Sequence, residues 1–287
     1  MISLKSYKKE IEKVFQKQNI DAEEVNILFC EVLNLSLSKL VFKTEITAKE
    51  KSKIDVAVKK RLMGIPIQKI FKRAYFYGYT FFVNNNVLCP RPETELLVEE
   101  VLNCIKSAKN SKNNAKNTQK TAKKLKILDL CTGSGCIAIA TKKNCDEEIF
   151  ASDISSKALY VARKNAKNLD VKIKFIQSNL FQNINGKFDI IVSNPPYIKS
   201  SDIQNLDVEV KNYDPILALD GGDDGLDFYK KIASQSKNYL NKNGFVILEI
   251  GQGQANDVKN LFGKNGFDCT IKKDYNNIER IVVCKLK

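Results

Sequence analysis

The sequence of 287 residues contains no histidine, and its eight cysteines form no C-x-x-C pair. Zinc centres in proteins are built mainly from these two residue types, so we expect no metal site in this chain. The missing histidine also removes the side chain that most often acts as a general base near neutral pH. Any catalysis must therefore work without one. Cysteines scattered in this way are typical of reduced thiols that fill a core in a reducing compartment.

The sequence also lacks a long hydrophobic run. No stretch of 18 apolar residues is present that could span a bilayer, and the lysine-rich start, MISLKSYKKEIEKVF, lacks the apolar core of a signal peptide. We therefore expect a cytoplasmic protein that does not contact membranes. A hydrophobic fraction of 43% and a charged fraction of 28% are ordinary for a globular protein, and the length favours two domains.

Acidic residues are too few to balance the basic ones, and the net charge is +14. Residues 106–126, KSAKNSKNNAKNTQKTAKKLK, contribute eight lysines and no acid. A segment so rich in Lys, Asn and Thr has little to bury and predicts a solvated, partly disordered loop or a frayed helix. Two interpretations stay open: a tolerated surface insertion, or a segment that makes weak contact with RNA or the ribosome.

The first 70 residues predict a small bundle of helices. Apolar residues recur at helical spacing, at Leu4, Tyr7, Ile11, Val14 and Phe15 and again at Val25, Leu28, Phe29 and Val32. Two pairs with capping-box spacing, Asp21 with Glu24 and Thr47 with Glu50, predict helix starts. Because no catalytic cluster stands out in this part, we expect residues 1–70 to form a substrate-docking domain.

Residues 91–287 alternate between short apolar strands and helices. Strands are predicted at LKILDL, EIFASD, IKFIQS, FDIIVSN, GFVILEI, CTIKK and RIVVCKL, and helices at 136–143, 156–168, 225–240 and 254–262. Strands separated by helices form a mostly parallel sheet covered on both faces. The last two strands have no helix between them, so one of them should run antiparallel. Upstream of this α/β domain, aromatic residues and the turn signal Gly78 predict a β-hairpin linker at 71–90.

The first of these strands leads into a glycine-rich turn, DLCTGSGCIA. Gly133 and Gly135 allow the backbone to approach a ligand where a helix begins, and Asp153 ends the next strand, where a carboxylate can bind ribose hydroxyls. This pattern predicts a nucleotide-like cofactor. The spacing Gly133-x-Gly135-x-x-Ala138 also fits a dinucleotide fingerprint, so the turn alone does not separate an NAD enzyme from an S-adenosylmethionine enzyme.

The fourth strand runs into Asn194, Pro195, Pro196 and Tyr197, beside the crevice where open α/β sheets bind ligands. Asn194 offers an amide acceptor and donor, the prolines stiffen the chain while their carbonyls stay free to accept, and Tyr197 offers a flat face for stacking. An amide nitrogen is a poor nucleophile because its lone pair is delocalised. If Asn194 Oδ1 and the Pro195 carbonyl accept both of its N–H groups, the lone pair can point at a methyl sulfonium. This arrangement favours an S-adenosylmethionine-dependent methyltransferase that needs no histidine.

Six stretches carry a wider similarity. They are ILDLCTGSGCIAIA, CPRPETELLVEE, ASDISSKALYVARKNA, FDIIVSNPPY, EVKNYDPILALDGGDDGLDFYKKI and LEIGQGQ. Together they resemble the motifs of the HemK/PrmC family of glutamine-N5 methyltransferases, over nearly the whole chain. The resemblance implies a Rossmann-like, seven-stranded methyltransferase domain at 91–287 with S-adenosylmethionine as cofactor. It also implies that the substrate is the glutamine of the Gly-Gly-Gln motif in peptide chain release factors, and we expect a monomer.

Carried over by position, the resemblance implies a role for each site residue. Asn194 and Pro195 would be catalytic, and the whole stretch from Asn194 to Tyr197, including Pro196, would bind the glutamine. The residues implied to bind the cofactor are Cys131, Thr132, Gly133, Ser134, Gly135, Asp153, Asn179, Leu180, Arg91, Thr94 and Asn194. The family usually has glycine in place of Cys131 and an acid in place of Asn179. A cysteine adds a Cβ beside the cofactor and an asparagine is a weaker acceptor, so both substitutions bear on cofactor affinity.

Three other functions fit parts of the sequence. Asn-Pro-Pro-Tyr is shared with methyltransferases of exocyclic amines, so adenine in DNA or RNA, flipped out of its stack, is an alternative substrate. A non-catalytic module that binds RNA or the ribosome would use the lysine-rich segment 106–126 and a degenerate pocket. An NAD dehydrogenase would need a hydride-transfer partner that the sequence does not show.

Overall fold

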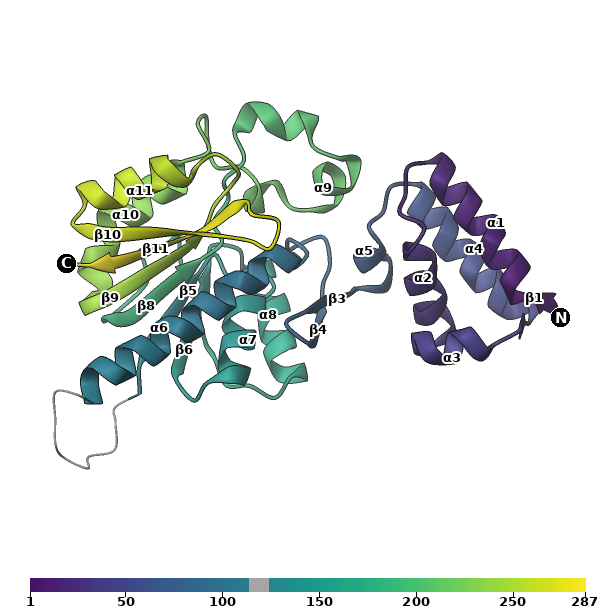
Figure 1. Ribbon diagram of the computed structural model, residues 1–287, viewed down its shortest axis with the longest axis horizontal. Helices are drawn as coiled ribbons and strands as arrows, with labels where there is room; N and C mark the ends of the chain where they lie inside the picture. Colours follow the sequence, from purple (N-terminus) through teal and green to yellow (C-terminus); the bar gives the residue numbers. More distant parts are fainter. Residues whose placement is uncertain (114–123) are drawn as a thin grey trace. The chain divides into compact units, whose positions relative to one another are not determined.

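The computed structural model describes residues 1–113 and 124–287 and divides into two compact units (Figure 1). The first unit comprises Met1–Arg73 together with Asp207–Tyr213, and the second comprises Ala74–Leu206 and Asp214–Lys287. The segment Asp207–Tyr213 therefore groups with the N-terminal residues, although its neighbours in sequence belong to the second unit. No helix in the described parts of the chain is long and apolar enough to cross a membrane.

Helices and a small sheet make up the first unit. The helices are α1 (Leu4–Lys17), α2 (Glu24–Leu33), α3 (Leu37–Phe42), α4 (Ala48–Leu62), α5 (Ile67–Phe71) and α9 (Val208–Tyr213), and β1 (Ile2–Ser3) pairs with β2 (Glu45–Ile46). The predicted apolar faces of the first two helices pack into one core, in which Phe15, Leu28 and Phe29 are fully buried. The small helical bundle predicted for the N-terminal residues is confirmed.

The two predicted capping boxes have different outcomes. Thr47 caps α4, because Thr47 Oγ1 accepts from the Glu50 amide at 3.2 Å and Glu50 Oε2 accepts from the Thr47 amide at 2.7 Å. The box predicted at Asp21 is wrong, since α2 begins at Glu24 and Glu23 takes the N-cap position without a side-chain bond. Asp21 instead accepts from the Glu23 amide at 2.9 Å and stabilises the preceding turn.

A seven-stranded sheet organises the described part of the second unit. Its strands are β5 (Lys126–Leu130), β6 (Glu148–Asp153), β7 (Lys174–Gln177), β8 (Phe188–Ser193), β9 (Leu240–Glu249), β10 (Phe267–Lys273) and β11 (Glu279–Leu286), in the spatial order β10-β11-β9-β8-β5-β6-β7. The predicted strands are all present. β11 is antiparallel to both of its neighbours, as expected for one of the last two strands, and the remaining ladders are parallel. The strand order reverses between β5 and β8, and ligands of open α/β sheets bind at such a point.

Helices cover both faces of this sheet (Figure 1). They are α6 (Glu95–Asn113), α7 (Cys136–Asn144), α8 (Ser156–Asn168), α10 (Asp227–Tyr239) and α11 (Ala255–Lys264). The last four lie close to the predicted helix positions. Successive residues of a strand point to opposite faces, so Ile127 and Ile190 pack with α6 and α7, whereas Leu128 and Ile191 pack with α10 and α11. The loop or frayed helix was predicted over 106–126. Residues 106–113 belong to the end of α6, and residues 114–123 lie outside the described residues.

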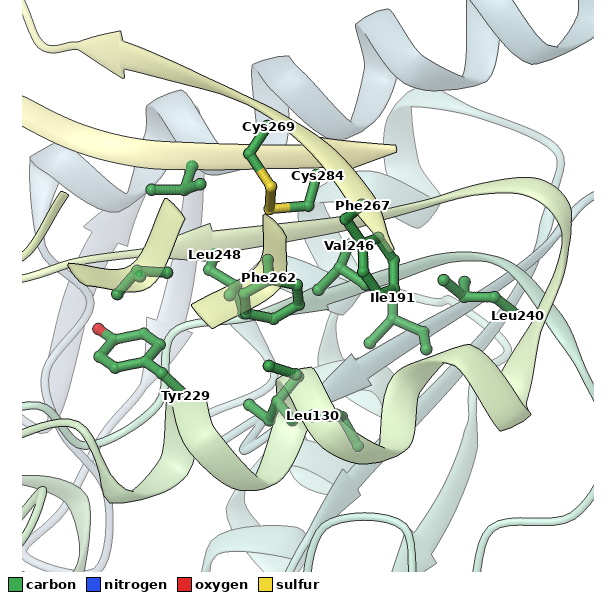
Figure 2. Packing of buried hydrophobic residues seen from close by; sticks show 14 of the residues in the cluster. Leu130, Ile191, Tyr229, Leu240, Val246, Leu248, Phe262, Phe267, Cys269 and Cys284 are labelled. Atoms are coloured by element: carbon green, nitrogen blue, oxygen red, sulfur yellow. A yellow bond between two sulfur atoms is a disulfide. The ribbon is translucent and has the colours of Figure 1, made fainter. Parts of the chain in front are cut away.

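The core on the α10–α11 side contains a pair of cysteines (Figure 2). The register of β10 and β11 places Cys269 opposite Cys284, and the two form a disulfide. The expectation of reduced thiols is wrong for this pair, because strand pairing brings together two residues that lie apart in sequence. The other six cysteines, Cys30, Cys89, Cys104, Cys131, Cys136 and Cys145, form no disulfide within the described parts of the chain.

The predicted hairpin is present as β3 (Arg73–Phe76) and β4 (Tyr79–Phe82). Its two turn residues, Tyr77 and Gly78, both have positive φ, at 50° and 77°, as a two-residue hairpin turn requires. Asn165 of α8 anchors the hairpin within the second unit. Its Oδ1 accepts from the Phe82 amide at 2.7 Å, and its Nδ2 donates to the Phe82 carbonyl at 3.0 Å.

Candidate active site

The loop 131–135 joins β5 to α7, and Cys131, Gly133 and Gly135 in it have positive φ, at 58°, 54° and 80°. The two glycines serve different purposes. A Cβ on Gly135 would lie 3.1 Å from the Cβ of Ala162, so this glycine allows α7 and α8 to pack closely. A Cβ on Gly133 would meet nothing within 4 Å, and Gly133 lines a pocket. The backbone at Gly133 is therefore open to a ligand.

The side chain of Asp129 stabilises the loop 131–135 through hydrogen bonds. Its Oδ2 accepts from Thr132 Oγ1 at 2.6 Å and from the Ala138 amide at 3.2 Å, which joins the loop to the first turn of α7. Burial raises the pKa of Asp129 to about 7, the bonds from Thr132 and Ala138 lower it, and the charge of Asp153 raises it. The Thr132 amide donates to the Ser152 carbonyl at 3.0 Å, so the loop is also fixed to the end of β6.

Asp153 ends β6, as predicted, and lines the same pocket. Its Oδ2 accepts from the Gly133 amide at 2.9 Å, and its Oδ1 accepts from the Ser155 amide at 2.9 Å. Burial raises its pKa, while bonds from the backbone at Ser155, Gly133 and Ile154 lower it. An ionised carboxylate has about four acceptor sites, so each oxygen can still accept a hydroxyl from a ligand.

The pocket at the carboxyl ends of the parallel strands collects most of the predicted site residues. Those that line it are Arg91, Thr94, Cys131, Thr132, Gly133, Ser134, Asp153, Asn179, Leu180, Asn194 and Pro196. Gly135, Pro195 and Tyr197 do not line it. Several other wall residues were not predicted to belong to the site, and these are 86–90, Pro215, Leu217, Ala218 and Phe228. All of these residues belong to the second unit, and the walls come from segments that only the fold brings together.

Cys131 takes the place of the glycine that the resembling family usually has. Its φ of 58° lies in the left-handed region that favours glycine, so the position has the backbone conformation that the family's glycine suits. Burial and then the charge of Asp153 raise the pKa of its thiol, and a bond from Ser193 lowers it. The thiol is therefore a neutral group against the pocket at neutral pH.

Arg91, Asn179 and Leu180 line the pocket from two other segments. Arg91 is half exposed, and its Nη2 lies 3.6 Å from Oδ2 of the buried Asp214. Ser178 Oγ donates to the Leu180 carbonyl at 2.7 Å, and Leu180 has a φ of 47°. This turn after β7 presents Asn179 to the pocket, where a neutral amide stands in place of the family's usual acid.

Asn194 directly follows β8, whose end is fixed because Ser193 Oγ donates to the Leu130 carbonyl at 2.7 Å. Asn194 Nδ2 donates to Thr94 Oγ1 at 3.3 Å. The resemblance implied that Thr94 contacts the cofactor. The structure places it in the pocket wall and against Asn194, with only 3% of its surface exposed. Because Nδ2 is turned toward Thr94, the opposite end of the amide, Oδ1, is the end that can face a substrate.

The backbone that follows Asn194 is held by Gln254, the last residue of LEIGQGQ, for which the sequence alone indicated no role. Gln254 Nε2 donates to the Tyr197 carbonyl at 3.0 Å and to the Gly225 carbonyl at 3.2 Å, while its Oε1 accepts from the Gly251 amide at 2.9 Å. A Cβ on Gly225 would lie 2.5 Å from the Tyr197 carbonyl oxygen. Glycine is therefore required here by close approach, and the motif LEIGQGQ acts by fixing the Asn-Pro-Pro-Tyr loop.

The motif LALDGGDDG also fixes the Asn-Pro-Pro-Tyr loop, through backbone hydrogen bonds. The Ile198 amide donates to the Leu219 carbonyl at 2.9 Å, and the Gly221 amide donates to the Ile198 carbonyl at 2.8 Å. A Cβ on Gly221 would lie 2.8 Å from Tyr197 Cα. The two motifs carried the resemblance as sequence signatures, and their physical role is to position the loop that carries Asn194.

Glu249 ends β9 beside Asn194 and is only 3% exposed. Burial raises the pKa of this carboxyl to about 7. A hydrogen bond from Thr94, the charge of Arg280 and a hydrogen bond from Asn194 lower the pKa, whereas the charge of Glu93 raises it. The sequence offered two signals for this residue, its place in LEIGQGQ and an acid at the end of an otherwise apolar strand.

Known proteins provide an independent comparison. Residues 8–71 match the model of the PrmC N-terminal domain, and residues 109–211 match that of the methyltransferase small domain. The release factor glutamine methyltransferase of Thermodesulfovibrio yellowstonii is 39% identical over 96% of this chain and 96% of its own length. This chain belongs to the release factor glutamine methyltransferase family. The protein of the same name from Agrobacterium fabrum is 39% identical over 90% of this chain and 88% of its own length.

A solved structure shares the fold of this member of the release factor glutamine methyltransferase family. The T. thermophilus 16S rRNA N2 G1207 methyltransferase, in complex with AdoMet and guanosine, has a TM-score of 0.51 over 75% of this chain and 50% of its own. At 13% identity this likeness concerns the fold alone. The predicted α/β methyltransferase fold with an N-terminal helical bundle is confirmed.

Proposed function

We propose that this protein transfers a methyl group from S-adenosylmethionine to the side-chain amide nitrogen, N5, of the glutamine in the Gly-Gly-Gln motif of peptide chain release factors. The relatives that match over nearly the whole chain are named release factor glutamine methyltransferases. The relation to those proteins supports the substrate class, and the pocket in the second unit supports the cofactor.

The pocket residues fit S-adenosylmethionine. Gly133 leaves its backbone open, and Asp153 keeps acceptor sites that suit two ribose hydroxyls. Thr132 and Asp129 hold the loop in place without extending a charged group into the pocket. When bound, S-adenosylmethionine supplies an electrophilic methyl group on a positively charged sulfur.

Asn194 is the residue that we expect to accept a hydrogen bond from the substrate amide. Its Nδ2 is engaged by Thr94, so its Oδ1 can accept one N–H of the substrate amide, and the Pro195 carbonyl can accept the other. Two fixed acceptors orient the nitrogen so that its lone pair faces the methyl group. Gln254 and the glycines around Tyr197 keep this loop rigid, so the acceptors need no reorganisation during transfer. This is chemistry that a chain without histidine can perform.

Mass spectrometry of a release-factor peptide that contains Gly-Gly-Gln tests the function. After incubation with the protein and S-adenosylmethionine, the glutamine should gain the mass of one methyl group. A matched peptide with glutamate in place of the glutamine lacks the amide and should gain nothing. Labelled DNA and RNA, incubated in parallel, test the exocyclic-amine alternative. Methyl transfer to nucleic acid with an unmodified peptide would overturn the proposal.

A further inference from the structure

The end of β9 lies beside the end of β8, next to the proposed acceptor site. These two strands are parallel neighbours, and Ser193 pairs with Leu248 in their register. The next residues are Asn194, directly after β8, and Glu249, the last residue of β9, so the register places an acidic side chain next to the proposed catalytic amide. Adjacent strands are about 4.8 Å apart, which is within hydrogen-bonding reach of the two side chains.

The hydrogen bonds among these side chains have one direction. Asn194 Nδ2 donates to Thr94 Oγ1 at 3.3 Å. The Thr94 hydroxyl has a single hydrogen and accepts from Asn194, so its own hydrogen remains for the carboxylate of Glu249. The Thr94 hydroxyl and the Asn194 amide both lie close enough to Glu249 to lower the pKa of its carboxyl. The carboxylate oxygen Oε2 of Glu249 is buried and has no hydrogen-bond partner among the described residues. This oxygen can therefore accept a hydrogen bond from the Asn194 amide group.

We propose that Glu249 is a positioning residue that, together with Thr94, fixes the amide of Asn194 with Nδ2 turned inward and Oδ1 turned toward the substrate nitrogen. This inference rests on the proposed function, because it concerns the acceptor for the glutamine amide. The two ends of an asparagine amide have nearly the same shape, so packing alone does not select one orientation. An ionised carboxylate only accepts hydrogen bonds, and it therefore selects the orientation in which Nδ2 faces it. The opposite orientation would direct an N–H group at the N–H groups of the substrate.

The charge on Glu249 also strengthens the acceptor that the substrate meets. Hydrogen bonds to an ionised acceptor are stronger than neutral ones, and bonds in a chain polarise one another. A carboxylate that accepts from Nδ2 therefore increases the electron density on Oδ1 of Asn194. When Glu249 is protonated, it loses its charge and one of its oxygens becomes a donor. The strengthening of Oδ1 is then lost, and the selection of one amide orientation is weakened.

Burial raises the pKa of Glu249 to about 7, so the protonation of Glu249 occurs within the pH range in which enzymes are assayed. Two charged groups face Glu249. Arg280 lies on β11 and also pairs with Asp274 at 3.2 Å, and Glu93 lies in the 3-10 turn Pro92–Thr94. The other titratable groups coupled to it by charge are Tyr197, Tyr229 and Cys136, whose pKa values burial raises. These three stay neutral between pH 6 and 8. The pH response of the amide in this range is therefore expected to follow Glu249.

The first experiment compares Glu249→Gln with the wild type in peptide methylation between pH 6 and 8. Wild-type kcat should rise with pH through an apparent pKa near 7, because the ionised form is the active one. Glu249→Gln should lower kcat about tenfold or more, by analogy with the loss of groups that orient a ligand residue. The step due to Glu249 should be missing from its pH profile, which keeps only the response of Asp129 at the cofactor loop, whose pKa burial also raises to about 7. The affinity for S-adenosylmethionine, measured by calorimetry without peptide, should change less than about twofold. Wild-type kcat and pH dependence in the variant would overturn the proposal.

Two further sets of variants separate positioning from general loss of structure. Thr94→Val keeps the shape of the side chain and removes the hydroxyl, so kcat should fall, whereas Thr94→Ser keeps the hydroxyl and should retain most of it. Glu147→Gln is the matched control for removing a buried carboxylate. Glu147 is 1% exposed and accepts from the Leu125 amide beside the opposite ends of the strands, so its variant should keep the wild-type pH profile. Equal losses in Thr94→Val and Thr94→Ser would contradict the hydrogen-bonded arrangement.

A measurement without turnover distinguishes this inference from the proposed function. In protein labelled with ¹⁵N-asparagine, the side-chain amide resonance of Asn194, assigned by its loss in Asn194→Ala, should titrate with a midpoint near pH 7. In Glu249→Gln the resonance should not titrate. If the peptide is not methylated but the resonance titrates in this way, the proposed function fails while the orientation of Asn194 by Glu249 holds. A resonance that does not respond between pH 6 and 8 in the wild type would overturn the inference even if the peptide is methylated.

Discussion

Replacing Gly225 with alanine should move the Tyr197 carbonyl and slow methyl transfer. The added Cβ would lie 2.5 Å from that carbonyl oxygen and 2.8 Å from Gln254 Nε2, whereas ordinary contacts begin at 3.4 Å. Relief of the overlap requires a shift of 3.4 − 2.5 = 0.9 Å. The Tyr197 backbone continues directly from Asn194, Pro195 and Pro196, so the shift is transmitted to the two proposed acceptors.

The size of the effect follows from this distance. A misplacement of about 1 Å at a catalytic site can cost roughly 100-fold in rate, so we expect kcat to fall by about that factor. The free energy of unfolding should fall for two reasons. Alanine at the φ of 74° costs about 1–2 kcal/mol, and the forced repacking adds about 1–3 kcal/mol.

Gly253→Ala is the matched control. Gly253 has a φ of 84° in the neighbouring motif, but a Cβ there would meet nothing within 4 Å. This variant has the same backbone cost without the displacement, so it should lose stability by about 1–2 kcal/mol and keep kcat within about threefold. Peptide methylation followed by mass spectrometry, and urea unfolding of both variants, give the comparison. If Gly225→Ala and Gly253→Ala have the same kcat, the positioning of Asn194 through Tyr197 is refuted.

Three further changes test other parts of the site. Asn194→Ala should cost about 3–4 kcal/mol of barrier, or 10²–10³ in kcat measured at saturating S-adenosylmethionine; full activity would contradict its role as acceptor. Gly133→Ala should weaken cofactor binding measured by calorimetry, while the cofactor-free protein loses only about 1–2 kcal/mol, since the Cβ enters open space; unchanged affinity would show that the cofactor does not approach this loop. Relative to the wild type, Glu249→Gln should gain about 2 kcal/mol in free energy of unfolding as pH rises from 5 to 8. The sign follows because burial raises the pKa of Glu249 from 4.5 to about 7, so the folded wild type holds a proton that the unfolded chain releases, and it loses that advantage as pH rises. Urea titrations at the two pH values check this, and a constant difference between the proteins would exclude the raised pKa.

Local sequence patterns predicted most of the secondary structure because the forces involved act over a few residues. The strands were evident from short apolar runs, and Thr47 with Glu50 marked the start of α4 through bonds that span one turn. Asp21 with Glu24 had the same spacing but formed a different turn, because several local bonding patterns are open to an aspartate. The disulfide between Cys269 and Cys284 depends on the register of two strands, and spacing along the chain does not specify register.

For the active site, the sequence by itself determined which chemical groups are present. The glycine-rich turn, Asp153 and the Asn-Pro-Pro-Tyr stretch each follow a strand, and parallel strands bring their carboxyl ends to one edge of the sheet. This rule was sufficient to place Gly133, Asp153 and Asn194 around one pocket.

Only the tertiary structure decided how Asn194 is held. Thr94 precedes it by 100 residues and Glu249 follows it by 55, and they meet because β9 lies beside β8 while the turn before α6 packs against both strand ends. Gln254 and Gly225 reach Tyr197 in the same way. The acceptor is fixed by hydrogen bonds and close contacts between distant segments, which depend on strand register and packing. No pattern of neighbouring residues encodes these.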